Sequence, residues 1–253
     1  MQHDLKQRLK DGQTIIGSFI TTGSPDAAEI IAGSGFDFLV IDTEHGPMSV
    51  ESALHLVRAS EVRGVPAVLR VTNALDTTIL RSLDIGAAGV QVPQVNTADT
   101  AREVVTASHY HPVGRRGLAM PRAADYGALS VKEYFQQSLE QTLVIAQCES
   151  AEGLENIESI AEVPGIDVIF LGPFDLSHSL GIPGEVEDPR IKEAERRIVD
   201  VCERNGKAAG IFAVNGAAGR QRIMQGFRYV TVATDALFLT AAAGNELKTA
   251  RGE

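Results

Sequence analysis

Short apolar runs alternate with amphipathic segments along the sequence. Eight runs of about four to seven residues are rich in Val and Ile, and segments with helical spacing of apolar residues lie between them. A strand buried on both faces reads as a continuous apolar run. The alternation therefore predicts a parallel sheet covered by helices. The runs are Ile15–Ile20, Phe38–Ile41, Ala67–Val71, Gly89–Val95, Leu143–Ala146, Val168–Leu171, Ala208–Val214 and Tyr229–Val232.

The number of runs and the chain length favour the barrel form of this sheet. Eight strands with intervening helices fit 253 residues as one α/β domain, a TIM (β/α)8 barrel spanning residues 1–253. An open doubly wound sheet is the alternative. The Ala- and Leu-rich segment Asp235–Lys248 predicts a final helix that packs on the barrel or on a neighbouring subunit.

Composition narrows the class of protein. The formal net charge of −10 argues against a nucleic-acid surface. The two cysteines, Cys148 and Cys202, give no disulfide framework. Residues 1–13 lack the apolar core of a signal peptide, and no apolar run approaches the length of a membrane span. We expect a cytoplasmic protein with no membrane or nucleic-acid partner.

One segment, from His109 to Tyr126, interrupts the alternation. It reads HYHPVGRRGLAMPRAADY, with two prolines, two glycines and no helical period. This pattern predicts a long functional loop. Its arginines, Arg115, Arg116 and Arg122, can form a substrate gate, lie in a subunit interface or be solvated surface charges, and we favour the interface.

Polar residues follow the apolar runs, where a TIM barrel carries its chemistry. Gln147 and Glu149 are two residues apart and share one face of their strand, so Cys148 faces the helices and is expected to be buried. Asp175 follows the next run. Glu149 and Asp175 together can bind a hard divalent cation such as Mg²⁺ or Mn²⁺. The alternatives are a salt-bridged or exposed Glu149, and an N-cap role for Asp175.

Two basic residues lie at other strand ends. His45 is the one histidine of six that directly follows a predicted strand, within the cluster DTEHG. A carboxylate there can fix its tautomer, as a general base needs; the alternative is a non-catalytic histidine. Arg70 ends the run AVLRV. It can clamp a carboxylate or stabilise an enolate oxygen, or it can form an inter-strand salt bridge.

The lysines argue against Schiff-base chemistry. The chain has six, and only Lys207 adjoins a predicted strand, at the beginning of that strand. Active sites of TIM barrels lie at the opposite end. Carbanion chemistry in this chain would therefore depend on a metal ion rather than on an imine.

Six segments, in this order, resemble the HpcH/HpaI aldolase family, the metal-dependent class II pyruvate aldolases similar to 2,4-dihydroxyhept-2-enedioate aldolase. They span residues 36–184, and a weaker match, GIFAVNG, extends them to residue 216. The segments are FDFLVIDTEHGPMS, PAVLRV, GAAGVQVPQVNTADTA, HPVGRRG, VIAQCES and GIDVIFLGPFDLSHSLGIPG.

The resemblance implies a TIM barrel assembled as a hexamer, a trimer of dimers that exchange their last helix. It implies that Glu149 and Asp175 bind Mg²⁺, Mn²⁺ or Co²⁺. Arg70 would stabilise the enolate and the keto oxygen. His45, paired with Asp84, would perform acid–base chemistry.

The resemblance also implies a donor site. Gln147 would hold the substrate or a metal-bound water, and backbone amides around Gly172, Pro173 and Phe174, next to Asp175, would receive the pyruvate carboxylate. Position 174 is usually Ser or Ala in the family, and the loop usually reads RYPP where this chain has HYHP. These differences do not change the residues expected to bind the metal and stabilise the enolate. They bear on which aldehyde the site accepts.

The expected activity is metal-dependent cleavage or formation of the bond between a pyruvate or hydroxypyruvate enolate and an aldehyde. The partners are thus a 2-oxo acid and an aldehyde, and oxaloacetate decarboxylation is an expected side activity. One alternative is a related lyase or decarboxylase acting on a CoA thioester or on oxaloacetate. A second alternative is a non-catalytic barrel that serves as a binding module.

Overall fold

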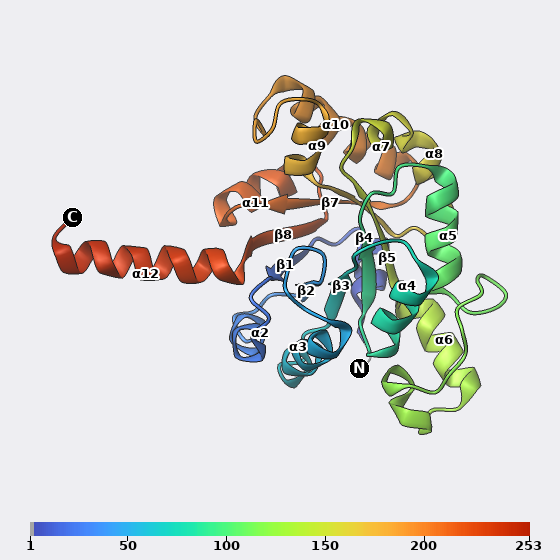
Figure 1. Cartoon of the computed structure of the whole chain (residues 1–253). Helices are drawn as coiled ribbons and strands as arrows, with labels where there is room; N and C mark the ends of the chain where they lie inside the picture. The colour runs from blue at the N-terminus through green and yellow to red at the C-terminus, as the bar shows by residue number, and fades with distance from the viewer. Residues whose placement is uncertain (1–2) are drawn as a thin grey trace.

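The strands β1 to β8 pair in chain order, all in parallel, and β8 returns to pair with β1 (Figure 1). The computed structural model describes residues 3–253. The predicted TIM barrel is confirmed and the open sheet is wrong, because a closed barrel has no edge strand. The strands are β1 Ile15–Ile20, β2 Phe38–Asp42, β3 Ala67–Arg70, β4 Gly89–Val92, β5 Leu143–Cys148, β6 Val168–Leu171, β7 Ala208–Ala213 and β8 Tyr229–Thr234.

Every apolar run of the sequence begins at the first residue of a strand; the run and the strand end together in β1 and β6, and their ends differ by one to three residues in the other six. The largest difference is in β4, which ends at Val92 rather than at Val95. Pro93 has no N–H to donate to a neighbouring strand. Gln94 takes a left-handed backbone conformation, with φ of 53°. The chain therefore leaves the barrel here earlier than its apolar residues predict.

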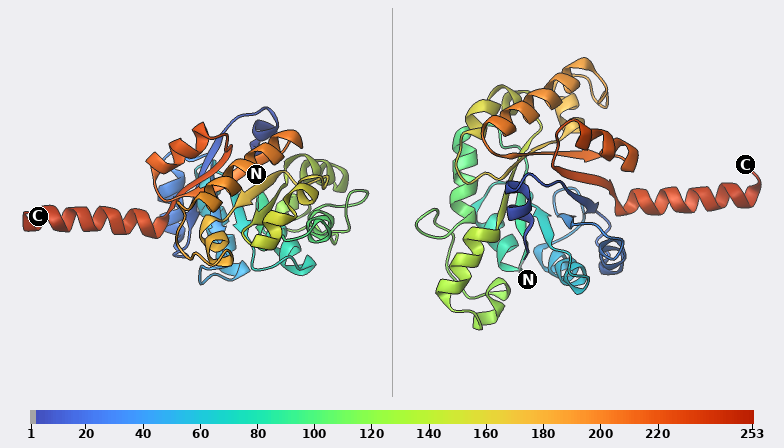
Figure 2. Two further views of the ribbon diagram at one scale, coloured as in Figure 1. Left: turned by 90° about the horizontal axis from the view of Figure 1, so that it is seen from above. Right: turned by 180° about the vertical axis from the view of Figure 1, so that it is seen from behind.

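Helices surround the barrel (Figures 1 and 2). Many begin at a side chain that accepts a backbone hydrogen bond; Ser49 and Thr97, for example, accept from the N–H groups of Ser52 and Thr100. The helices are α1 Leu5–Lys10, α2 Pro25–Ala32, α3 Val50–Val62, α4 Asp76–Asp84, α5 Ala98–Ser108, the 3₁₀ helix η1 Arg122–Gly127, α6 Val131–Gln141, α7 Ala151–Glu155, α8 Ile157–Ala161, α9 Pro173–Ser179, α10 Pro189–Arg204, α11 Gly216–Met224 and α12 Asp235–Arg251.

Alternate residues of each strand point into the barrel or out to the helices. Along β2, Phe38 and Val40 belong to the interior cluster, whereas Leu39 and Ile41 pack against the helices. The Phe38 ring stacks on that of Tyr229, with centroids 4.4 Å apart. A Cβ atom on Gly17 would lie 2.4 Å from the Phe38 ring, so glycine is required there. These side chains fill the lower barrel, and a ligand can enter only above them.

The segment from His109 to the start of η1 is irregular, as predicted, and its arginines and Arg122 of η1 bind carboxylates of the same chain. Arg116 pairs with Asp84 at 2.6 Å and Arg115 with Asp76 at 3.3 Å, while Arg122 pairs with Glu61. The loop is thus anchored to its own barrel by ion pairs.

Helix α12 projects away from the barrel (Figures 1 and 2). Along it, Leu237, Phe238, Leu239 and Leu247 are exposed. Its first residue, Asp235, is buried and accepts hydrogen bonds from the backbone and side chains of Thr21 and Thr22. In the described part of the chain, no helix is long and apolar enough to cross a membrane.

The two thiols are expected to be inert in the folded protein. Cys148 and Cys202 are buried, as predicted for Cys148, and burial raises the pKa of both to about 12. Because the thiolate is the reactive form, a disulfide reagent such as DTNB at pH 8 should release no thiol signal within minutes. Unfolding in guanidinium chloride should then release two thiols per chain. Prompt reaction of the native protein would contradict this burial.

Candidate active site

A cavity of about 330 Å³ opens at the carboxyl ends of the strands. His45, Arg70, Gln147 and Asp175, which were predicted for this end of the barrel, all line the cavity. Glu149, also predicted here, is not among the lining residues. The full lining is Phe19, Thr21, Asp42, His45, Arg70, Gln147, Phe170, Gly172, Pro173, Phe174, Asp175, Phe212 and Thr234.

A buried ion pair crosses from β2 to β3. Asp42 and Arg70 lie opposite each other in register, and Arg70 Nε and Nη2 donate to Asp42 Oδ1 and Oδ2 at 2.9 and 2.5 Å. Burial alone would lower the pKa of Arg70, but the hydrogen bond and charge of Asp42 raise it. Arg70 Cζ also lies 5.0 Å from the centre of the Phe19 ring. Arg70 thus forms the inter-strand pair and also lines the cavity.

Asp42 also organises the turn that carries His45. Its Oδ1 accepts from the N–H groups of Glu44 at 3.1 Å and His45 at 3.2 Å. The His45 side chain is 65% exposed, and its Nε2 lies 4.0 Å from Glu44 Oε2. Burial raises the pKa of Glu44, although Arg70 Nη1, at 3.3 Å from Oε2, opposes the rise. His45 is therefore exposed at the cavity mouth, beside the Glu44 carboxylate.

Two glutamines orient Glu149. Gln91 Nε2 donates to Gln147 Oε1 at 2.7 Å, and Gln147 Nε2 donates to Glu149 Oε2. The N–H of Gln94, in its left-handed conformation, donates to Glu149 Oε1 at 2.9 Å. Burial raises the pKa of Glu149, which is only 2% exposed. The chain thus holds a desolvated carboxylate beneath the cavity.

Asp175 brings a second carboxylate beside the first. It lies in the first turn of α9, and its negative charge contributes to the raised pKa of Glu149. Helix α9 begins at Pro173 with Gly172 as its N-cap, so the alternative of an N-cap role for Asp175 is wrong. A Cβ on Gly172 would lie 2.9 Å from Glu149 Oε2. Glycine here lets the β6 end approach Glu149.

The donor set fits a hard divalent cation. Among residues 3–253, no group of three His, Cys, Asp or Glu side chains is arranged to hold a metal ion, so Glu149 and Asp175 would be two ligands beside water and substrate oxygens. A bound cation would offset the repulsion between the two carboxylates. It would also offset the cost of burying the charge of Glu149.

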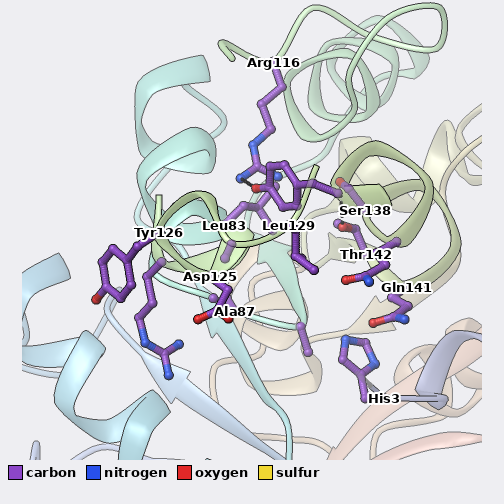
Figure 3. A pocket seen from close by; sticks show the side chains of 16 residues that line it. His3, Leu83, Ala87, Arg116, Asp125, Tyr126, Leu129, Ser138, Gln141 and Thr142 are labelled. Atoms are coloured by element: carbon purple, nitrogen blue, oxygen red, sulfur yellow. Dashed lines mark hydrogen bonds between the residues drawn. The ribbon is translucent and has the colours of Figure 1, made fainter. Parts of the chain in front are cut away.

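Asp84 lies away from these residues. Helix α4 ends at Asp84 and β4 begins at Gly89, which places Asp84 near the amino ends of the strands. There it pairs with buried Arg116, which lines a second cavity of about 420 Å³ (Figure 3). His45 follows the carboxyl end of β2. The expected pair of His45 and Asp84 is therefore not formed within one chain.

Sequence reasoning missed the residues that hold the others in place. Asp42, Gln91 and Gln94 were visible as polar residues at strand ends, yet no role was assigned to them. The register would have identified Asp42, because it is directly opposite Arg70. The role of Gln94 depends on a left-handed backbone conformation that no local sequence pattern indicated.

Comparisons with known proteins agree with this geometry. A family model described as HpcH/HpaI aldolase/citrate lyase matches residues 15–242. A 2-keto-3-deoxy-L-rhamnonate aldolase from Salmonella paratyphi A is 37% identical, over 98% of this chain and 92% of that protein.

Solved structures give the same result. An HpcH/HpaI aldolase/citrate lyase family protein from Burkholderia cenocepacia J2315 is 37% identical with a TM-score of 0.93, covering 98% of this chain and 99% of that chain. The citrate synthase SbnG is 33% identical with a TM-score of 0.89, covering 98% and 97%. The resemblance seen in the sequence is confirmed: this chain belongs to the HpcH/HpaI aldolase/citrate lyase family and is a lyase.

Proposed function

We propose that the protein is a divalent-metal-dependent aldolase that forms or cleaves the bond between the enolate of pyruvate, or of hydroxypyruvate, and an aldehyde. The observation that carries this proposal is the pair of neighbouring carboxylates, Glu149 and Asp175: Asp175 lines the cavity together with Arg70, and Glu149 lies buried beside it. The Salmonella relative, named as an aldolase of a 2-keto acid, supports it.

Glu149 and Asp175 are the proposed ligands of Mg²⁺, Mn²⁺ or Co²⁺. A bound divalent ion supplies Lewis-acid stabilisation of the enolate. Gln147 serves as the orienting group, because its amide N–H on β5 donates to Glu149, which directly follows that strand. Arg70 adds a fixed positive charge for the keto and enolate oxygen, and Asp42 keeps the guanidinium from turning away.

The backbone at the start of α9 is the proposed receptor of the donor carboxylate. Pro173 has no N–H, and the N–H of Gly172 donates to the carbonyl of Cys148 at 3.2 Å. The first N–H groups of a helix have no partner within it. The N–H groups of Phe174 and Asp175 are therefore those left to bind the carboxylate.

His45 is the proposed general base. In cleavage it takes the proton of the C4 hydroxyl as the C3–C4 bond breaks. In synthesis it returns this proton to the aldehyde oxygen, which becomes the C4 hydroxyl. Since Asp84 lies at the other end of its own barrel, the pair of His45 and Asp84 can form only between subunits. This requirement agrees with the hexamer that the family resemblance implies, which we propose for this protein, and the exposed apolar residues of α12 support exchange of that helix.

Oxaloacetate decarboxylation is the proposed side activity, because loss of CO₂ from oxaloacetate gives the same enolate. The alternative of a CoA thioester as the substrate is less well supported. The loop arginines Arg115, Arg116 and Arg122 are each paired with a carboxylate of this chain, so they offer no free cation for CoA phosphates. The arrangement of Arg70, Glu149 and Asp175 also argues against a non-catalytic barrel.

The metal requirement can be tested on the donor alone. Deuterium exchange at C3 of pyruvate, followed by ¹H NMR, should require added Mg²⁺, Mn²⁺ or Co²⁺ after chelation. Glu149→Gln should lower the exchange rate by at least about 100-fold, because Lewis-acid stabilisation is worth several kcal/mol. Glu152→Gln, at an exposed position of α7, is the matched control. Undiminished exchange in chelator would disprove the metal requirement.

The role of Asp42 can be tested separately. In Asp42→Asn, Arg70 loses the charge that fixes it, and kcat/KM for aldol cleavage should fall by roughly 10- to 100-fold. Stability should also fall, since losing one partner of a buried pair costs about 3–5 kcal/mol. Asp99→Asn removes an exposed pair with Arg102 and should change stability by under about 1 kcal/mol. Equal effects of both substitutions, measured by urea unfolding, would refute the assignment.

The assembly can be tested through α12. Sedimentation should give six times the mass of one chain, and the double variant Leu239→Asp/Leu247→Asp should shift the protein to smaller species, because it puts charge on an apolar interface. Met224→Asp, at a residue that is also exposed, should leave the mass unchanged. If the wild-type protein stays monomeric at all concentrations, both the proposed helix exchange and the proposed pairing of His45 with Asp84 are wrong.

A further inference from the structure

The upper layer of the barrel has a polar half and an aromatic half. On β2 to β5, the uppermost inward residues are Asp42, Arg70, Gln91 and Gln147, which are joined in two hydrogen-bonded groups. On β6, β7 and β1, the corresponding residues are Phe170, Phe212 and Phe19. Asp42, Arg70, Gln91 and Gln147 therefore face a wall of rings.

The rings of this wall pack edge to face. Phe19 contacts Phe170 and Phe212, with centroids 6.4 and 5.9 Å apart. Phe174 adds a fourth ring at the mouth, where it is 47% exposed although it is large and apolar. Arg70 lies over the Phe19 ring, so the wall begins where the proposed enolate oxygen is bound. A substrate group directed away from Arg70 meets the phenylalanines.

Two threonine hydroxyls on the aromatic side each already take part in a hydrogen bond. Thr21 Oγ1 donates to Asp235 Oδ1 at 2.8 Å, and Thr234 Oγ1 accepts from the N–H of Leu237 at 3.1 Å. A substrate hydroxyl placed there would lose its hydrogen bonds to water and would contact aromatic carbon atoms instead. A buried hydroxyl without a partner is unfavourable.

We infer that the acceptor site takes an apolar aldehyde, with a branched aliphatic or aromatic group, in preference to a hydroxylated one. This inference rests on the proposed function. In synthesis, C3 of the donor enolate bonds to the aldehyde carbon, and the aldehyde oxygen takes a proton as it becomes the C4 hydroxyl. The group attached to the aldehyde carbon lies against Phe19, Phe174 and Phe212.

Two aldehydes that differ in one group test the inference. 2-Methylpropanal carries a methyl where 2-hydroxypropanal carries a hydroxyl, and both share the same donor half-reaction with pyruvate. Their kcat/KM ratio therefore cancels the donor half-reaction, and a change of the ratio between wild type and a variant also cancels the intrinsic reactivities of the two aldehydes. The wild-type ratio should favour the methyl by at least about 10-fold, since one group in an apolar pocket is worth roughly 10- to 200-fold.

Two variants of Phe174 identify the wall as the cause. Phe174→Leu keeps an apolar side chain and should retain the preference, whereas Phe174→Asn should reduce the ratio by about fivefold or more. Met224→Asn, at an exposed residue of α11 outside the cavity, should leave the ratio as in the wild type. Thermal unfolding of each variant shows that it is folded before the ratios are compared.

The outcomes separate this inference from the proposed function. If pyruvate exchanges deuterium without aldehyde but 2-hydroxypropanal reacts as well as 2-methylpropanal, the aldolase proposal stands and the apolar acceptor site is overturned. An unchanged ratio in Phe174→Asn overturns the role of Phe174. If neither exchange nor addition occurs with any of the metals, the proposed function fails and the acceptor assignment fails with it.

Discussion

The ion pair of Asp42 and Arg70 is the interaction on which the polar half of the site depends. The Asp42 carboxylate accepts from two nitrogens of Arg70 and from the N–H groups of Glu44 and His45. One side chain thus fixes the direction of the cation and the turn that carries the histidine. Because the pair is buried, removing either partner leaves an unpaired charge in a poorly solvated place.

The fold could be predicted because each strand is a compact apolar run and each connection is long enough for a helix. The strand bounds were less accurate where a backbone feature ended the pairing, as at Pro93 and Gln94. The direction in which α12 leaves the barrel could not be predicted. An apolar helix face is compatible with packing on its own barrel or on another subunit, and the sequence carries no signal that separates the two.

The candidate site was predictable to the extent that it follows strand alternation. Gln147 and Glu149 share an inward face, and Arg70 is the last inward residue of β3, as the positions of these residues in the sequence suggested. Contacts between distant segments were not predictable. The pairing of Gln91 with Gln147 joins residues 56 positions apart, and the assignment of Asp84 to the same site came from the family resemblance rather than from its place in the chain.

The anchoring of α12 has a consequence for assembly. Asp235 is buried and bonded to Thr21 and Thr22, and these hydrogen bonds lower its pKa although burial opposes them. The helix therefore leaves the barrel in one direction before any partner arrives. An element that is ordered in advance loses little conformational entropy on association. A subunit contact made by α12 would thus retain more of its apolar binding energy than one made by a flexible tail of the same composition.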